Sequence, residues 1–302
     1  MKGNLETEQG SLDYEITLDT AVITGYSGRD AIIQIPEEIG GNPVVGVGKK
    51  AFLSNKALRK ITLPNNIAGI GDWAFAYCGN LEQVIVPYRQ IEMGQGVFKE
   101  CGRLVRIEDS AGRREGAGGE DVACLLAAVV NQLDAFYLFD LENVGTESWL
   151  AGWDARVKTL LALKDNEGFS KMLLCGEEDY GSRENDLGYY MEQKRRGKVR
   201  LAMLRLMHDY GLQEDLRANM RNYLLAHIKG CETEETWQVV LEEHGDDRTY
   251  YEFLTSLGGV TKENFSQMMA DMGERHTEMK AYLMRYHEGL RDTGDAFERF
   301  KL

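Results

Sequence analysis

The sequence predicts an α+β chain of two parts, a short β-solenoid followed by an all-helical acidic domain. Apolar positions recur every 23 residues in the first part, all four prolines lie at or before Pro87, and later apolar residues follow helical spacing. A fixed short period is typical of a solenoid, in which each unit buries its apolar face against its neighbours. Because proline interrupts helices, its absence from the second part allows continuous helices there.

The repeat is clearest between residues 47 and 87. Segment 47–52 (VGKKAF) recurs as 70–75 (IGDWAF), and segment 58–64 (LRKITLP) recurs as 81–87 (LEQVIVP). A partial third copy follows at the same offset, with Gly94, Phe98, Leu104 and Ile107. We expect each copy to hold a short strand with alternating inward and outward side chains, which its proline ends.

The repeated apolar positions predict a stacked core. Phe52, Phe75 and Phe98 occupy one repeat position and are expected to stack from unit to unit. Asn55, Cys78 and Cys101 share another position, where a free cysteine is usually a small buried apolar residue rather than a reactive thiol.

The region before the repeats predicts an N-terminal cap. Residues 1–11 are polar and are expected to be frayed or disordered. Segments 14–18 and 21–26 alternate in polarity around a polar dipeptide, which indicates a hairpin. Segment 32–35 matches the later strands and is expected to be the first of them.

These residues carry a family resemblance. The pattern AF-x5-L-x2-I-x-LP-x5-IG-x2-AF starts at Ala51, and a cysteine stands three residues after both Phe75 and Phe98. Together with the lead-in 23–28 it resembles the BspA-like leucine-rich repeats of bacteria over residues 12–109. The resemblance implies a leucine-rich-repeat domain, and surface-displayed relatives act as adhesins.

A composition change marks the predicted domain boundary. Residues 110–119 are rich in small residues without apolar periodicity, which predicts a Gly-rich linker. Residues 120–302 are predicted to form the all-helical domain. Segments 186–211 and 264–289 each suggest two helices around a basic break, at 194–197 and at 273–276. Segment 259–264, followed by segment 281–286, resembles ankyrin-like helix pairs. An irregular bundle is the alternative. Four glycines are expected to end helices, namely Gly211, Gly230, Gly245 and Gly289.

Charge and cysteine content exclude several classes of function. The formal net charge is −14, of which residues 1–119 carry only −2, and an acidic chain is a poor nucleic-acid binder. No apolar run is long enough for a membrane span, and the first eight residues do not form a signal peptide. The five cysteines lack CxxC spacing, which favours a reducing, cytoplasmic location. The cell surface is the alternative if a leader has been removed.

The candidate chemical groups favour structural roles, so we expect no catalytic residue, cofactor or metal. His208-Asp209 and His287-Glu288 pair an imidazole with a carboxylate, but sequence neighbours on a helix point apart, so a role at helix ends is expected. The acidic runs 177–179 and 242–247 lack the ligand spacing of a calcium loop. Cys175 and Cys231 have no evident histidine partner. The methionines of the last third, Met268, Met269, Met272, Met279 and Met284, are expected in the core.

The predicted function is non-catalytic protein–protein interaction or scaffolding. Solenoids present a continuous strand face that commonly holds a partner. The outward residues of that face are expected to be Ile32, Gln34, Lys60, Thr62, Gln83, Ile85, Arg106 and Glu108. Their mixed character suits a protein or peptide better than a polyanion. A surface adhesin and an enzyme with its site in the helical domain are the alternatives.

Overall fold

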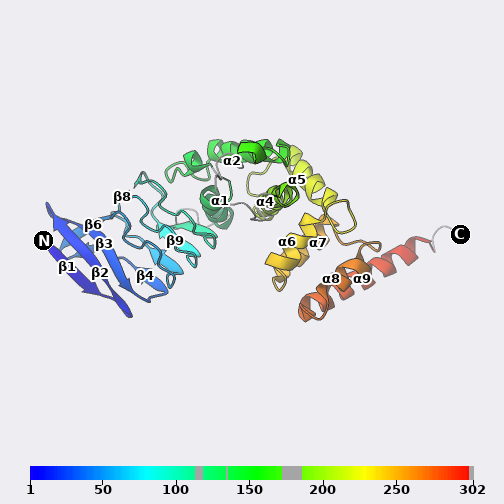
Figure 1. Ribbon diagram of the computed structural model, residues 1–302, viewed down its shortest axis with the longest axis horizontal. Coiled ribbons are helices and arrows are strands. Elements are labelled where there is room, and N and C mark those ends of the chain that lie inside the picture. Colours follow the sequence, from blue (N-terminus) through cyan, green and yellow to red (C-terminus); the bar gives the residue numbers. More distant parts are fainter. Residues whose placement is uncertain (113–117, 134, 172–185, 299–302) are drawn as a thin grey trace. The chain divides into compact units, whose positions relative to one another are not determined.

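A computed structural model describes residues 1–112, 118–133, 135–171 and 186–298, the last nine of them by their backbone alone. A β-solenoid is followed by a helical region, as the sequence predicts (Figure 1). The chain divides into two compact units. The first holds Met1–Arg156 and His208–Gly211, and the second holds Val157–Met207 and Leu212–Leu302. The first unit therefore continues well past residues 110–119, where the sequence predicts the boundary.

The larger sheet of the first unit joins the N-terminal cap to one side of the solenoid. Its strands follow the order β1-β2-β3-β6-β8-β10, and β5 pairs with β6 beside this path. Pairing is antiparallel from β1 to β3 and parallel from β3 onward. The strands are β1 (Lys2–Glu6), β2 (Gly10–Thr17), β3 (Thr20–Gly28), β5 (Glu38–Ile39), β6 (Asn42–Val47), β8 (Gly69–Ile70) and β10 (Glu92–Met93).

The second sheet contains the predicted repeat strands. It is fully parallel in the order β11-β9-β7-β4. Its strands are β4 (Ile32–Gln34), β7 (Lys60–Thr62), β9 (Gln83–Val86) and β11 (Arg106–Asp109). Pro64 and Pro87 follow β7 and β9 closely, in keeping with their role as strand ends.

The N-terminus is ordered, so the prediction that residues 1–11 are frayed is wrong. Strand β1 pairs with β2 from Lys2↔Glu15 to Glu6↔Ser11, and the terminal ammonium of Met1 donates to the Ile16 carbonyl at 2.6 Å. The error arises because strand pairing uses main-chain groups that every residue carries, so a polar segment can pair without an apolar pattern. The predicted hairpin is formed by β2 and β3.

An aromatic stack runs through the solenoid and into both of its caps. The predicted neighbours Phe52, Phe75 and Phe98 are stacked, with ring centroids 5.1 Å and 5.5 Å apart. Tyr26 from β3 continues the stack at one end, 5.6 Å from Phe52, and Phe139 lies 6.1 Å from Phe98 at the other. The stack thus explains why residues beyond the repeats belong to the same unit.

Helical segments close the C-terminal end of the solenoid. They are α1 (Gly119–Asn131), the 3-10 turn η1 (Phe136–Leu138) and the start of α2 (Glu147–Ala162). Helix α1 packs on β11 and buries every residue from Val122 to Val129. The Asn131 side chain donates to the Leu104 carbonyl at 2.7 Å, and Trp153 Nε1 donates to the Leu125 carbonyl at 3.1 Å. A helix buried on nearly all sides belongs to a core, which places this part of the predicted helical domain in the solenoid unit.

The second unit is helical. Its helices, besides the end of α2, include α4 (Leu187–Met207), α5 (Glu214–Ala226), α6 (Glu235–Glu243), α7 (Arg248–Leu257), α8 (Phe265–Met272) and α9 (Thr277–Glu298). The predicted break at 273–276 separates α8 from α9, and Gly211, Gly230 and Gly245 lie beyond helix ends. No helix of the described part is long and apolar enough to cross a membrane.

Two predicted helix interruptions are wrong. Residues 194–197 lie inside α4, because Arg196 bonds Glu242 and Glu243 at 2.7 Å each and the basic run is thereby neutralised within a continuous helix. Gly289 lies inside α9 rather than after it. An interior glycine costs a helix only about 1 kcal/mol, which neighbouring contacts can offset. The prediction of two helices in 186–211 is therefore wrong, and the ankyrin-like resemblance is not confirmed.

Candidate functional site

The eight residues predicted to face outward lie together on the four-stranded sheet, in two rows that cross its strands. The first row is Ile32, Lys60, Gln83 and Arg106, and the second is Gln34, Thr62, Ile85 and Glu108. Paired residues of adjacent parallel strands point to the same side, and so do residues two apart on one strand. We call these eight residues the strand face.

An apolar layer lies beneath the strand face. Between the two rows the side chains point inward, and Ile33, Ile61, Val84 and Ile107 are at most 2% exposed. Ladder pairing holds Ile61 and Val84 from both sides, and it holds Ile33 and Ile107 of the edge strands from one side. The outward side chains therefore stand on a close-packed support, which holds their spacing constant.

The strand face is uneven in charge and exposure. Ile32 at one edge is 68% exposed, whereas the residues of β7, β9 and β11 are half-buried. At the other edge Arg106 pairs with Glu108 at 2.9 Å and with Glu120 of α1 at 3.4 Å. Glu108 and Glu120 thus partly neutralise Arg106, and the rest of the face is apolar or neutral polar apart from its second cation, Lys60.

A cluster of buried charges in the second unit has no signal in the sequence. Arg195 lies 2.5 Å from Glu235, which is 3% exposed, and 3.5 Å from Asp165. Lys198 bonds Asp165 at 2.7 Å, and His227 Nδ1 lies 3.5 Å from Glu235. These five residues are far apart in the chain and show no spacing that sequence reasoning could use. A buried acidic residue flanked by cations is a structural ion pair unless a substrate site adjoins it.

The histidines of the two histidine–carboxylate neighbours contact residues elsewhere in the chain. His208 follows the end of α4, as predicted, but its Nδ1 lies 3.1 Å from Asp121 Oδ1, and Asp121 also accepts from the Tyr210 N–H. His287 lies inside α9, so the prediction of a helix-end role is wrong for it. Its ring stacks on Phe265 at 3.9 Å. Both histidines therefore contribute to packing between segments.

The solenoid cysteines are buried donors rather than nucleophiles. Cys78 Sγ donates to the Phe52 carbonyl and Cys101 Sγ to the Phe75 carbonyl, both at 3.1 Å. Burial raises the pKa of Cys78 to about 11, of Cys101 to about 12 and of Cys124 to about 11. These thiols are protonated at neutral pH, and a protonated thiol is a poor nucleophile.

The acidic and methionine-rich runs are used in packing. Glu243 pairs with Arg196 and Arg200 at 2.7 Å, and Asp246 lies 2.8 Å from His276. The described residues form no group of three or more His, Cys, Asp or Glu side chains that could hold a metal ion. Residues 177–179 and Cys175 lie outside the described part of the chain. Met268, Met272 and Met279 are buried, as predicted, whereas Met284 is 49% exposed.

Comparison with known proteins supports the repeat architecture. Residues 33–112 match the family model of the BspA type leucine rich repeat region in 6 copies. Among curated proteins nothing matches. The match covers the solenoid and leaves the helical region outside it.

Three solved structures are similar to parts of the chain. A leucine rich repeat protein of T. pallidum is 33% identical over 32% of this chain and 46% of its own, with a TM-score of 0.31. A leucine-rich repeat protein from Bacteroides capillosus is 27% identical over 36% of this chain and 83% of its own, with a TM-score of 0.31. A leucine rich cell surface protein from Faecalibacterium prausnitzii is 23% identical over 36% of this chain and 34% of its own, with a TM-score of 0.30. The chain thus spans less than half of the first and third of these.

Proposed function

We propose that the protein binds a protein or peptide partner on the strand face and has no catalytic role. The observation that carries the proposal is the register of the two rows, which sets eight outward side chains over a buried apolar layer. A surface fixed in this way loses little side-chain freedom when a partner binds, which favours binding. The BspA-type repeat region supports the same kind of role, since stacked repeats generally serve as binding surfaces.

The size of the strand face limits the partner. Four parallel strands are about 15 Å wide, since neighbouring strands lie about 4.8 Å apart. With strands of three or four residues, about 10–13 Å long, the face covers about 150–200 Å², well below the roughly 800 Å² of one side of a standard protein interface. The face therefore suits a short extended segment or one edge of a domain. The formal charge of −14 opposes a polyanion as partner.

A matched pair of threonine variants tests the proposal. Thr62→Arg places a long cation at the centre of the strand face, and Thr24→Arg makes the same change at an exposed position of β3 in the other sheet. With the full chain immobilised as bait and native lysate applied, a partner of the strand face should be retained by the wild type and by Thr24→Arg and lost with Thr62→Arg. If all three proteins retain the same partners in the same amounts, the strand face is not the binding surface.

The location of the protein is part of this proposal. We propose a cytoplasmic interaction protein, and a surface adhesin is the alternative. Reading the coding sequence upstream of Met1 for a leader, followed by protease treatment of intact cells, separates the two. Cleavage of the protein on intact cells would overturn the cytoplasmic proposal.

A further inference from the structure

The outer turns of the solenoid form a second hydrogen-bonded ladder, which we call the turn ladder. The N–H groups of Lys50, Phe52 and Ser54 donate to the carbonyls of Asp72, Ala74 and Ala76 at 2.8–3.0 Å. One repeat later the N–H groups of Trp73, Phe75 and Tyr77 donate to Gln95, Val97 and Lys99 at 2.7–2.9 Å. Each turn thus has its carbonyls occupied by the N–H groups of the turn before it.

The first turn has no turn before it. By repeat register its carbonyls at Lys49, Ala51 and Leu53 correspond to those of Asp72, Ala74 and Ala76. Within the described part of the chain no N–H group donates to them. The N-terminal cap places the Tyr26 ring against Phe52, yet its backbone is used in pairing with β2. The open end of the turn ladder therefore carries a row of available main-chain acceptors.

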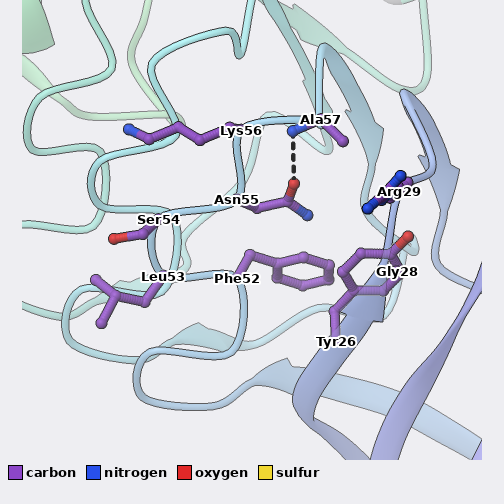
Figure 2. Close-up of a pocket in the computed structure, with 9 residues that line it drawn as sticks. All are labelled: Tyr26, Gly28, Arg29, Phe52, Leu53, Ser54, Asn55, Lys56 and Ala57. Carbon is purple, nitrogen blue, oxygen red and sulfur yellow. Dashed lines mark hydrogen bonds between the residues drawn. The ribbon is translucent and has the colours of Figure 1, made fainter.

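Asn55 adds an available donor to this row. It stands at the repeat position of Cys78 and Cys101, which donate to a carbonyl of the preceding turn. Its Oδ1 accepts from the N–H groups of Ala57 and Leu58 at 2.9 Å and 3.1 Å, while its Nδ2 is buried and has no partner among the described residues. Figure 2 shows the amide nitrogen turned toward the space beside Tyr26 and Arg29. A buried unpaired N–H group destabilises the protein, and a carbonyl placed beside it would remove that cost.

A pocket lies between the first turn and the N-terminal cap, lined by residues 52–57 on one side and by Tyr26, Gly28 and Arg29 on the other. Its volume is about 550 Å³, and Figure 2 shows the side chains that line it, among them Tyr26, Phe52 and Asn55. Arg29 on its rim is exposed, and Lys56 donates to the Tyr77 carbonyl at 2.6 Å. The pocket therefore brings together the Leu53 end of the acceptor row, the Asn55 amide and two cationic side chains.

We propose that this open end of the turn ladder binds an extended peptide segment through its main chain. Three alternate N–H groups of the peptide donate to the carbonyls of Lys49, Ala51 and Leu53, and the central peptide carbonyl accepts from Asn55 Nδ2. The peptide would extend the turn ladder in the way that an added strand extends the edge of a sheet. Main-chain hydrogen bonds supply the affinity in that mode of binding. The site shares no residue with the strand face, so it does not depend on the function proposed above.

The geometry of the existing turns sets the peptide sequence. Lys50 and Ser54 have φ angles of 59° and 60°, a left-handed conformation that glycine adopts at least cost, so the peptide should carry glycines four residues apart. Tyr26 already fills the aromatic position, which requires small residues between the glycines. Arg29 and Lys56 favour acidic flanks. The resulting pattern is acidic-Gly-small-small-small-Gly-acidic.

The test uses the full chain labelled with nitrogen-15 and the peptide acetyl-Asp-Gly-Ala-Ala-Ala-Gly-Asp-amide. Titration should shift the side-chain amide resonances of Asn55 and the backbone amides of residues 51–57. The same peptide with N-methyl groups on its central alanine and second glycine cannot donate those hydrogen bonds and should leave the resonances unchanged. Unshifted Asn55 resonances at millimolar peptide, or equal shifts with the N-methylated peptide or with free acetyl-aspartate, would overturn main-chain recognition.

Three variants locate the site. Asn55→Asp keeps the oxygen that accepts from Ala57 and replaces the donor with an acceptor, so peptide affinity should fall about tenfold. Asn66→Asp adds the same charge at an exposed position and should bind the peptide like the wild type. Thr62→Arg should also bind it normally, which separates this site from the strand face. Loss of peptide binding in Thr62→Arg, or its retention in Asn55→Asp, would refute the assignment.

Discussion

The two units of the chain bury their interiors with different chemistry. In the described part of the first unit, Asp30 is the buried charged residue, and the core consists of apolar ladders and the aromatic stack. The second unit buries Arg196, Lys198, Arg205 and Glu235 among its helices. Apolar burial is non-directional and tolerates repetition, whereas each buried charge needs a particular partner.

This difference in core chemistry determines which substitutions destabilise each unit. A repeat can be copied because every copy offers the same apolar surface to the next, which explains the recurrence of one pattern at 23-residue intervals. An ion pair such as Arg195–Glu235 exists once and depends on the charge of both members. The first unit should therefore be sensitive to lost volume, and the second to lost or altered charge.

Removing one ring from the stack should have the largest effect. Phe75 is fully buried between Phe52 and Phe98, so Phe75→Ala should lower the free energy of unfolding of the first unit by about 3–5 kcal/mol. Urea unfolding monitored by the hydrogen exchange of backbone amides measures the free energy of unfolding of each unit separately. Tyr77→Ala, which removes a ring that is 38% exposed, is the control and should cost far less. Equal losses for the two variants would contradict a stack that bears the stability of the solenoid.

Removing one buried charge should have the next largest effect, confined to the second unit. Glu235→Ala leaves Arg195, whose side chain is 14% exposed, without its closest partner, and should cost about 3 kcal/mol. The exposed pair Arg248–Glu252 has a similar distance of 2.8 Å, yet Glu252→Ala should cost less than about 1 kcal/mol. The same hydrogen-exchange measurement compares the two variants. A Glu235→Ala protein as stable as Glu252→Ala would show that the buried cluster adds nothing.

Mild acid should destabilise the second unit before the first. Burial lowers the pKa of His227 and of His244 below the ordinary 6.5, although carboxylates such as Glu235 and Glu243 oppose the shift. The unfolded chain then binds more protons, so stability is lost as the pH falls below 6.5. In the first unit the Thr7 hydroxyl, with Tyr26 and the Gln9 N–H, lowers the pKa of Asp30, so that contribution is lost only below its ordinary 3.8.

Hydrogen exchange at about pH 7.5 and about pH 5.5, corrected for intrinsic rates, tests this order. Protection should fall in α5 and α6 and remain in β7 and β9. His227→Gln and His244→Gln together should remove most of the pH dependence of the second unit. A parallel loss in both units, or none in either, would contradict the assignment to these histidines.

The same contrast decides how much could be predicted from the sequence. The solenoid, its aromatic stack and the common side of the eight outward residues follow from one period, because an inward residue in one copy implies an inward residue in the next. The strand formed by residues 2–6 could not be predicted, since main-chain pairing leaves no pattern in the side chains. The continuity of α4 through Gly197 was also beyond prediction, because it depends on Glu242 and Glu243 of another helix. The available donor of Asn55 becomes visible only when its neighbours' hydrogen bonds are known.

Changing the backbone strain in the turns should have the smallest effect on stability. One substitution there should stabilise the first unit, and another should destabilise it. Glu100 and Gly96 lie in one turn of the solenoid with φ angles of 58° and 57°. Glu100→Gly relieves a left-handed strain of about 1–2 kcal/mol and adds about 0.5–1 kcal/mol of unfolded-state freedom, so it should stabilise the first unit slightly. Gly96→Ala does the reverse and should destabilise it by about 1 kcal/mol, since an added Cβ would meet Lys99 and Trp73 at ordinary contact distances of 3.7–3.9 Å and strain is the main cost. Thermal unfolding should therefore move a little upward for the first variant and downward for the second. Shifts of the same sign would mean that side-chain contacts, rather than backbone conformation, govern these turns.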